Sequence, residues 1–273
     1  MRLATFRSGA DGAVGEIDVD SVHVLEAPSM IAWLRGEGHM RTGDVVGLDE
    51  AELLAPIPEP PSVRDFYAFE GHVATGWARR GGGVPPAWYD APAFYFANPA
   101  SIRGPGEPVP RPAETAELDF ELEIAAVIGA GGEIAGFTLM NDWSARDVQR
   151  REMTVGLGPA KGKDFATSLG PWLVTPDELP FEDGLLHLDA TVTVNGQELT
   201  RTSAAEQHFS WPDLLSHASR DTRLRAGDVL GSGTLNGGCL LELGLLEGER
   251  WLEPGDEVVL AAEGLGRLES RIA

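Results

Sequence analysis

Residues 117–129, ELDFELEIAAVIG, decide the fold, because acidic and apolar residues alternate along them. Successive side chains of a strand point to opposite faces, so this period of two predicts a half-buried strand. Asp119, Glu121 and Glu123 then share one face. Neighbouring like charges repel, and burying an unpaired carboxylate is costly. The face therefore requires either open water or a bound cation, and the strand alone leaves both explanations open.

The segment that follows favours the cation. The run MNDW adds a fourth acid, Asp142, and Arg146, Gln149, Lys161 and Lys163 follow it among glycines. A group of carboxylates with basic and amide side chains behind it suits a hard divalent cation that holds an anionic ligand. Magnesium, manganese or calcium fits such a site better than zinc, because no histidine or cysteine joins the acids.

Composition predicts a β-rich globular protein with more strand than helix. The chain has 273 residues, of which 42% are hydrophobic and 23% charged, and its 34 glycines and 19 prolines imply many turns. Lysine and arginine number 21 against 43 acidic residues, a formal charge of −22. Such a field repels nucleic acid and anionic membranes, so neither is an expected partner. A small anionic ligand would need a local positive site.

Cysteine content and hydropathy bear on location. Cys239 is the single cysteine of the chain, so an intrachain disulfide cannot form, which favours a reducing compartment. The first residues, MRLATFRSGADG, do not resemble a signal peptide, and no apolar run reaches about 18 residues. A cytoplasmic location is the expectation.

The chain is predicted to divide into two domains. Residues 1–54 form a small N-terminal β domain, and residues 55–62, APIPEPPS, contain four prolines and predict a stiff linker. The main domain then covers residues 63–273. Within the N-terminal domain we expect three short strands and one short helix, at Arg2–Phe6, Val14–Val19, Val22–Leu25 and Met30–Leu34.

A helix is predicted over Asp65–Arg80, from apolar residues at helical spacing before a glycine stop. It would place Asp65 and His72 on one side, about 10 Å apart along the axis. One helix would thus offer a carboxylate to a cation and an imidazole to a nearby water, although a histidine near an aspartate is often only a surface residue. Glu242 lies among leucines and requires a partner, for which a histidine would serve.

Three further elements are predicted in the second half of the chain. A short helix over Asn141–Arg150 would place Arg146 and Gln149 on one face, three residues apart. Lys163 lies in a loop that contains glycines. Glycine has no side chain, so the backbone of this loop can approach a ligand closely. Asn195-Gly196 predicts a two-residue hairpin.

Several motifs in this order, spread from about Pro56 to the end of the chain, resemble the fumarylacetoacetate hydrolase family. The resemblance implies a mixed β-rich (α+β) fold, a β-sandwich roll that works as a homodimer and that a small β domain precedes in some members. The motifs are DFYAFEGH (65–72), ELDFELEIAAVIG (117–129), MNDWSARDVQ (140–149), GKDFATSLGPW (162–172), LRAGDVLGSGT (224–234), EPGDEVV (253–259) and EGLGRL (263–268).

The resemblance also implies roles for single residues. Asp65, Glu121, Glu123 and Asp142 match the positions that bind a divalent metal, with Mg²⁺ expected and Mn²⁺ or Ca²⁺ as alternatives. His72 matches the catalytic histidine, and Glu242 matches its acidic partner, with Glu70 as a second candidate for that position. Lys163 matches a catalytic position. The implied substrate-binding positions are Arg146, Gln149, Tyr67, Tyr95 and Thr234.

The implied activity is metal-dependent hydrolysis of a carbon–carbon bond in a small anionic 1,3-diketo acid, of the fumarylacetoacetate or acylpyruvate type. Two alternatives remain. One is decarboxylation, tautomerisation or isomerisation of a 2-oxo acid within the same family, which uses the same metal but no attacking water. The other is a protein without catalytic activity in which the acids bind a divalent cation for stability.

Overall fold

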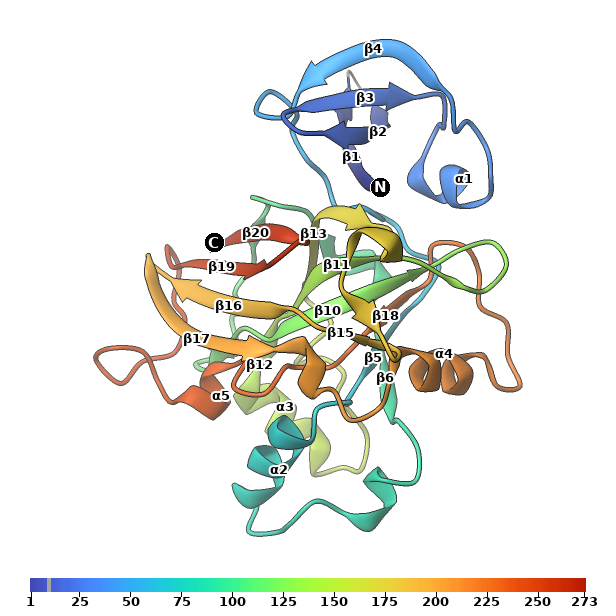
Figure 1. Ribbon diagram of the computed structural model, residues 1–273. Helices are drawn as coiled ribbons and strands as arrows, with labels where there is room; N and C mark the ends of the chain where they lie inside the picture. Colours follow the sequence, from blue (N-terminus) through green and yellow to red (C-terminus); the bar gives the residue numbers. More distant parts are fainter. Residues whose placement is uncertain (9–10) are drawn as a thin grey trace.

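The computed structural model describes residues 1–8 and 11–273 (Figure 1). Two large sheets dominate it, and five short α-helices lie at their ends and edges. This arrangement confirms the predicted mixed β-rich fold. None of the helices in these two ranges combines the length and the apolar character needed to cross a membrane.

The larger sheet contains eleven strands and runs through both halves of the chain. In spatial order it consists of β4 (Arg41–Gly47), β3 (Ser21–Leu25), β2 (Asp11–Asp18), β1 (Arg2–Ser8), β13 (Thr167–Val174), β11 (Ile134–Asp142), β10 (Leu122–Ile128), β18 (Val229–Gly231), β5 (Val63–Phe66) and β6 (Phe94–Ala97), and β7 (Ile102–Arg103) pairs with β13 from the side.

The second sheet has five strands and packs against the first. It consists of β17 (Gln197–Ser203), β16 (Asp189–Val194), β19 (Glu257–Ala262), β20 (Gly266–Ile272) and β8 (Pro108–Val109). Two small ladders pair β9 (Leu118–Asp119) with β12 (Ser144–Ala145), and β14 (Phe181–Glu182) with β15 (Leu185–Leu186). The main core lies between the sheets, where Phe137 and Leu139 of β11 join Val192, Leu260 and Leu268 of the second sheet.

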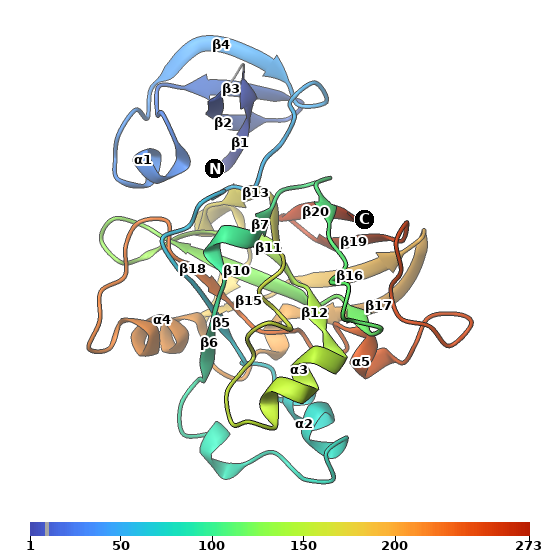
Figure 2. The same ribbon diagram turned by 180° about the vertical axis from the view of Figure 1, so that it is seen from behind.

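The helices gather mostly at one end. They are α1 (Met30–Leu34), α2 (Glu70–Ala78), α3 (Arg146–Met153), α4 (Trp211–Ser219) and α5 (Leu240–Leu243), and the 3₁₀ turns are Pro86–Trp88, Pro99–Ser101, Pro176–Glu178 and Ala204–Glu206. Both ribbon views place α2 and α3 at the end of the molecule opposite the lobe formed by β1 to β4 and α1 (Figures 1 and 2). The segments that enter the site therefore meet far from that lobe.

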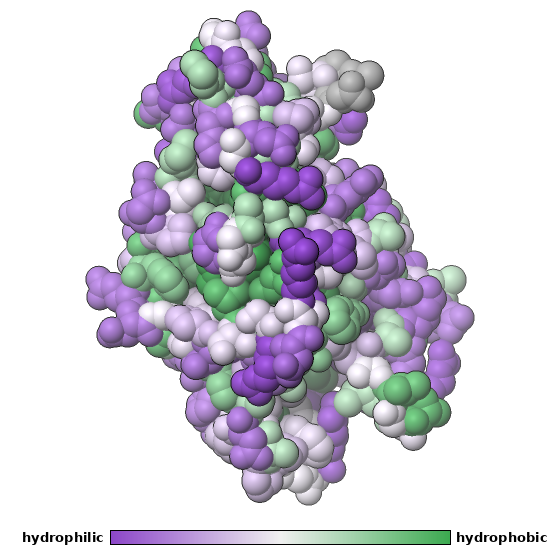
Figure 3. Space-filling model, turned by 90° about the vertical axis from the view of Figure 1, so that its right-hand side faces the viewer, coloured by the Kyte–Doolittle hydropathy of each residue, from purple (hydrophilic) through white to green (hydrophobic). Residues whose placement is uncertain are grey.

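The N-terminal lobe has the elements predicted for it and one more. Three strands and the helix Met30–Leu34 occur where the sequence indicates them, while β4 was not anticipated. β1 pairs with β13, with Arg2 opposite Val174, so the strands of the lobe extend the large sheet. On one side of the molecule the surface below the lobe is hollowed and largely apolar (Figure 3). The division into two domains with a linker at 55–62 stays a prediction.

The predicted helix over Asp65–Arg80 is wrong in its first part. Val63–Phe66 is strand β5, and the helix begins only at Glu70. β5 pairs in parallel with β18 and antiparallel with β6, so ladder hydrogen bonds on both edges outweigh the apolar spacing that predicted a helix. Asp65 and His72 consequently lie on different elements, and the helical distance between them does not apply.

The predicted helix over Asn141–Arg150 also starts too early. Asn141 and Asp142 end strand β11, and α3 begins at Arg146. The side chain of Asn141 accepts a hydrogen bond from the backbone N–H of Glu121 at 2.9 Å instead of capping a helix. The prediction that Arg146 and Gln149 share a helical face is confirmed, with Nη1 of Arg146 3.3 Å from Oε1 of Gln149.

The deciding stretch and the hairpin have their predicted backbone conformations, but the prediction of a half-buried strand is wrong, because side chains on both faces of β9 and β10 are buried. Residues 117–129 form β9 and β10, interrupted at residues 120 and 121, and Asp119, Glu121 and Glu123 are all buried. Their face is therefore not solvated. Asn195 and Gly196 both have positive φ angles, 49° and 82°, and join β16 to β17 as a two-residue turn.

Candidate active site

Three carboxylates converge in the interior, and we call Asp65, Glu123 and Asp142 the acid trio. They come from β5, β10 and the end of β11, and one oxygen of each lies within 4.8 Å of one oxygen of the others. All three are buried, at 3%, 0% and 0% exposure. Among the residues that the structure describes, Oδ1 of Asp65, Oε2 of Glu123 and Oδ1 of Asp142 find no hydrogen-bond donor.

Gly231 allows the trio to converge. β18 lies between β10 and β5, with Gly231 opposite Asp65. A Cβ atom at this glycine would lie 2.6 Å from Oδ1 of Asp65 and 3.0 Å from Oε2 of Glu123. Any side chain here would therefore occupy the space into which both carboxylates point. Sequence reasoning missed Gly231, and the GSGT motif was the available signal.

The trio carries more negative charge than its surroundings favour. Burial and the neighbouring acids raise the pKa of both Asp65 and Glu123 well above the ordinary range. Burial also raises the pKa of Asp142, although Lys163 opposes that rise. Converging buried carboxylate oxygens without donors suit a hard divalent cation, which takes oxygen ligands. The donor set of the trio thus fits the metal that the sequence predicts.

Lys163 and Tyr95 border the trio. Lys163 is 4% exposed, and its ammonium contacts both Glu121 and Asp142. Burial opposes its charge, but Asp142 and Glu121 outweigh burial and raise its pKa above the usual value. The hydroxyl of Tyr95 donates to Oδ2 of Asp142 at 2.6 Å. A cavity of about 600 Å³ opens at Tyr95 and Lys163, with Lys161 also on its wall.

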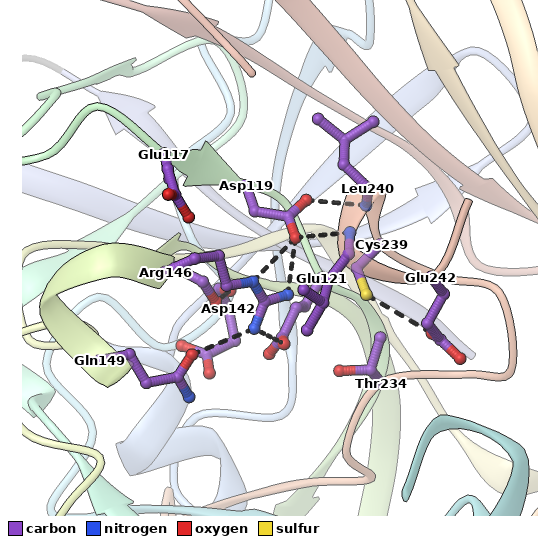
Figure 4. A network of polar contacts seen from close by, with 12 residues as sticks. Glu117, Asp119, Glu121, Asp142, Arg146, Gln149, Thr234, Cys239, Leu240 and Glu242 are labelled. Carbon is purple, nitrogen blue, oxygen red and sulfur yellow. Dashed lines mark hydrogen bonds and ion pairs between the residues drawn. The ribbon is translucent and has the colours of Figure 1, made fainter. Parts of the chain in front are cut away.

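Glu121 and Asp119 differ from the trio because each forms an ion pair with Arg146, and we call them the paired acids. The guanidinium of Arg146 lies between them, 2.7 Å from Oε1 of Glu121 and 2.8 Å from Oδ2 of Asp119 (Figure 4). Asp119 also accepts the backbone N–H groups of Leu240 and Leu241. Although burial opposes it, the charges of Arg146 and Lys163 lower the pKa of Glu121.

The same contacts define the position of Arg146. It is 3% exposed and engages both paired acids and Gln149. Its substrate-binding role stays a prediction, and its present partners are protein side chains. Asp119 was not singled out by sequence reasoning, although it belongs to the same alternating run. By holding the first turn of α5 as well as Arg146, Asp119 links β9 to the helix that carries Glu242.

His72 and Glu242 form a second feature of the site. Nδ1 of His72, in the first turn of α2, lies 2.9 Å from Oε2 of Glu242 in α5, and both side chains are at least nine-tenths buried. Glu70 instead contacts the hydroxyl of Tyr89 at 2.5 Å, so Glu242 is the residue that meets the imidazole. His72 is close enough to the paired acids to contribute to the lowered pKa of Glu121.

Two further predicted residues border these features. The ring of Tyr67 meets that of His72 edge-on with centroids 5.3 Å apart, and burial and Glu121 raise the pKa of its hydroxyl to about 12. The hydroxyl of Thr234 lies 3.5 Å from Oε1 of Glu123. The structure therefore brings all twelve predicted residues to one region. Eight of them lie in β5, α2, β6, β10, β11, α3 and α5, and the other four, Tyr67, Glu121, Lys163 and Thr234, lie in the segments between such elements. Their catalytic and binding roles stay predictions.

Asn236 is a further residue that the sequence did not indicate. Its Oδ1 accepts the backbone N–H of His72 at 3.1 Å, and its Nδ2 donates to Glu206 at 2.6 Å. The amide is thereby oriented by one acid while it holds the first turn of α2, which has no side-chain cap. The segment that leads into α5, the helix that carries Glu242, thus also fixes the backbone of His72.

A β-sandwich roll with buried acids beside a histidine–glutamate pair defines a class of enzyme, and family comparisons identify it. The family model described as fumarylacetoacetate (FAA) hydrolase C-terminal matches residues 62–273, and one described as Rv2993c-like, N-terminal, matches residues 1–56. The chain belongs to the fumarylacetoacetate hydrolase family. Family membership confirms the resemblance found in the sequence motifs.

Relatives within the family have different activities. A fumarylacetoacetase from Oryza sativa subsp. japonica is 31% identical over 300 residues, covering 84% of this chain and 70% of the relative. An oxaloacetate tautomerase from Bacillus subtilis is 27% identical over 268 residues, which cover 91% of this chain and 82% of the relative. The crystal structure of a 5-carboxymethyl-2-hydroxymuconate delta-isomerase from Mycobacterium smegmatis covers 100% of this chain and 99% of its own, at 27% identity and a TM-score of 0.76.

Proposed function

We propose that the protein is a metal-dependent hydrolase that cleaves a carbon–carbon bond in a small 1,3-diketo acid. The observation that carries this proposal is the 2.9 Å contact between His72 and Glu242. Glu121, which His72 influences electrostatically, and Asp142 of the acid trio share Lys163, which connects this pair to the trio. Hydrolysis needs a base for water and a site that stabilises a developing enolate, and these two features offer both. The 31% identity to a fumarylacetoacetase supports the same reaction.

The acid trio would hold the divalent cation, with Mg²⁺ as our first choice and Mn²⁺ or Ca²⁺ as alternatives. Glu121 would complete the set only by exchanging part of its pairing with Arg146 and Lys163. When bound, such an ion supplies Lewis-acid polarisation of the dicarbonyl oxygens, worth several kcal/mol.

The protein residues would then perform the proton transfer. Glu242 accepts the hydrogen on Nδ1 of His72, which leaves the lone pair of Nε2 free to take a proton from water. The hydroxide equivalent adds to one carbonyl carbon, the bond between the two carbonyl-bearing fragments breaks, and one fragment leaves as a carboxylate. The other leaves as an enolate and receives a proton. General-base help of this kind contributes about 10² to 10⁴ in rate.

Lys163 and Tyr95 would act on the substrate side. The ammonium of Lys163 lies on the wall of the 600 Å³ cavity, where it offers positive charge to a developing oxyanion. Tyr95, Tyr67 and Thr234 would bind the substrate around it, while Gln149, which accepts a hydrogen bond from Arg146, would meet the substrate carboxylate. We further propose that the active assembly is a homodimer, as the sequence resemblance implies, and size-exclusion chromatography with light scattering tests that.

A second candidate is isomerisation or tautomerisation of a 2-oxo acid. The isomerase structure covers the full chain, and the oxaloacetate tautomerase covers 91% of it, whereas the fumarylacetoacetase covers 84%. These reactions move a proton without consuming water. The pair of His72 and Glu242 would serve as a proton carrier in that case too.

A substrate panel separates these candidates. Fumarylacetoacetate, acylpyruvates and oxaloacetate are each assayed with Mg²⁺, with Mn²⁺ and with EDTA, in water enriched in heavy oxygen. A hydrolase places one heavy oxygen in the carboxylate product and loses about 10³-fold or more of its turnover in His72→Ala. His23→Ala, in the N-terminal lobe, is the matched control and keeps wild-type turnover. Turnover without incorporation of heavy oxygen into a new carboxylate contradicts hydrolysis and supports the isomerase.

A further inference from the structure

Cys239 lies against the pair of His72 and Glu242. Its Sγ is 3.4 Å from Oε2 of Glu242 and 4.0 Å from Nδ1 of His72, and those two atoms are 2.9 Å apart. Cys239 is fully buried, and the donor atoms of all three residues lie within 4.8 Å of one another. This triangle of sulfur, nitrogen and oxygen shares no residue with the acid trio.

We propose that this triangle is a second, inhibitory metal site that takes a borderline-soft divalent cation of the zinc type. Its effect on activity rests on the proposed role of His72 as the base, whereas its ability to bind the cation does not. Three protein ligands would leave the fourth tetrahedral position to water.

The geometry of the triangle is close to that of a zinc site. Bonds of about 2.3 Å to sulfur and about 2.0 Å to nitrogen and oxygen place tetrahedral ligands about 3.3 to 3.5 Å apart. The observed separations of 2.9, 3.4 and 4.0 Å bracket these values. Small side-chain rotations would therefore bring the three separations to the distances of a tetrahedral site without movement of α2 or α5.

The two sites differ in the cations they prefer. The acid trio offers only carboxylate oxygens, which suit Mg²⁺, Mn²⁺ or Ca²⁺. The triangle offers a thiol and an imidazole, which suit zinc and cobalt and bind magnesium poorly. Burial first, and then the negative charges of Asp119, Glu121 and Glu242, raise the pKa of the Cys239 thiol, while Arg146 opposes that rise. The same negative charges attract a cation, which displaces the thiol proton when it binds.

Occupation of the triangle would disable the base. The thiol releases one proton to solvent as sulfur binds the cation. The hydrogen on Nδ1 of His72 is displaced from the metal-bound nitrogen, and the neutral ring retains it on Nε2. Nε2 is then a donor and has no lone pair for water, and Glu242 is committed to the cation. Zinc would stop turnover even with the acid trio saturated by magnesium.

Cobalt absorption tests the binding without any substrate. The full-length protein, with magnesium in excess, is titrated with Co²⁺, and the near-ultraviolet charge-transfer band of a thiolate–cobalt bond is recorded. Since the chain has a single cysteine, such a band can come only from Cys239. We expect the band with wild-type protein and with Glu123→Gln, and its loss in Cys239→Ser. A titration of folded wild-type protein without the band overturns the site.

Zinc inhibition then tests the functional consequence. Each variant is compared with its own rate without zinc, at saturating magnesium. We expect the zinc concentration for half-inhibition to rise at least about 10-fold in Cys239→Ser, because even outer partners of a metal site change affinity about 10- to 100-fold. If the Cys239→Ser variant does not fold, the Cys239→Ala variant is used in its place. Equal zinc sensitivity of both proteins overturns the inhibitory role. A cobalt band without inhibition refutes His72 as the base while leaving the metal site intact.

Discussion

The acid trio and the paired acids lie side by side in the same buried region, but they are neutralised differently. Asp119 and Glu121 share the guanidinium of Arg146, and Glu121 also meets Lys163. Each member of the trio has a buried oxygen that receives no hydrogen bond within the described parts of the chain. Arg146 and Lys163 lower the pKa of Glu121, whereas burial and like charges raise that of Glu123. At Asp119 burial raises the pKa in spite of Arg146, so the two paired acids differ in the direction of the shift.

This difference separates acids that stabilise the fold from acids that await a ligand. A buried carboxylate with an internal counter-charge tolerates its loss of hydration, and removing either partner is costly. A buried carboxylate without one lowers stability and persists where function needs it. Within the trio Asp142 contacts Lys163, whereas neither Asp65 nor Glu123 forms an ion pair among the described residues. The paired acids should therefore matter mostly for stability, and the trio mostly for metal binding and activity.

The largest expected effect is on activity when the trio is broken. Glu123→Gln removes one charge from the trio and should lower kcat/KM about 10³-fold, since Lewis-acid help is worth several kcal/mol. Urea unfolding without metal should show no loss of stability, because the substitution removes repulsion between buried acids. A loss of stability that matches the loss of activity would mean that Glu123 is a structural acid after all.

The largest expected effect on stability comes from the paired acids. Asp119→Asn leaves Arg146 with one acid fewer and should lower the free energy of unfolding by about 3 to 5 kcal/mol. Glu117→Gln is the matched control, because Glu117 pairs with Arg150 at an exposed position and should change stability by less than about 1 kcal/mol. Denaturant curves measure both, and equal effects would contradict the distinction drawn from burial.

Metal addition should stabilise the protein through the trio. At about 100 times its dissociation constant, Mg²⁺ or Mn²⁺ should add about 2.7 kcal/mol to the free energy of unfolding of the wild-type protein. The gain should disappear in Glu123→Gln and persist in Asp119→Asn. Thermal unfolding with and without EDTA measures the difference. A full gain in Glu123→Gln would place the cation elsewhere.

The smallest expected effect concerns an ion pair between the buried Asp256 and the partly exposed Arg250. Arg250 contacts Asp256 at 2.6 and 2.9 Å, and Asn195 donates at 2.8 Å. Burial opposes the shift, but these hydrogen bonds lower the pKa of Asp256 from 3.8 to about 2. A lowered pKa in the folded state stabilises the fold above about pH 4, and that contribution is lost as the pH falls toward 2.

Asp256→Asn should therefore cost about 1 kcal/mol near neutral pH, less than the buried pair of Asp119 and Arg146. The difference between this variant and the wild-type protein should shrink as the pH is lowered from about 4. Urea denaturation at neutral and acidic pH gives both values. A difference that stays constant across this range would exclude the carboxylate charge as its cause.

Prediction from the sequence worked where the signal was local. The alternation in residues 117–129, the Asn195-Gly196 turn and the helix Met30–Leu34 all follow from side-chain spacing and turn chemistry. It failed where pairing with distant strands decided the conformation. Asp65 was placed in a helix because its apolar neighbours have helical spacing, yet β18 and β6 hold it in a strand.

The site shows the same limit. Motifs named the twelve residues that meet in one region, but no spacing distinguished Glu121, which meets Arg146, from Glu123, which does not. Gly231, Asp119 and Asn236 were missed, because their importance lies in what they touch across the sheet. A glycine that leaves room for two carboxylates looks in the sequence like any turn glycine.

The amino-acid sequence by itself determined that the protein is β-rich, strongly acidic and a member of this family, because composition, periodicity and motif order are properties of the chain. Only the tertiary structure decided which acids are neutralised, that Glu242 rather than Glu70 meets His72, and that Cys239 lies beside them. The reason is physical: the charge state and reactivity of a buried group depend on distances to groups far away in the chain, and folding alone sets those distances.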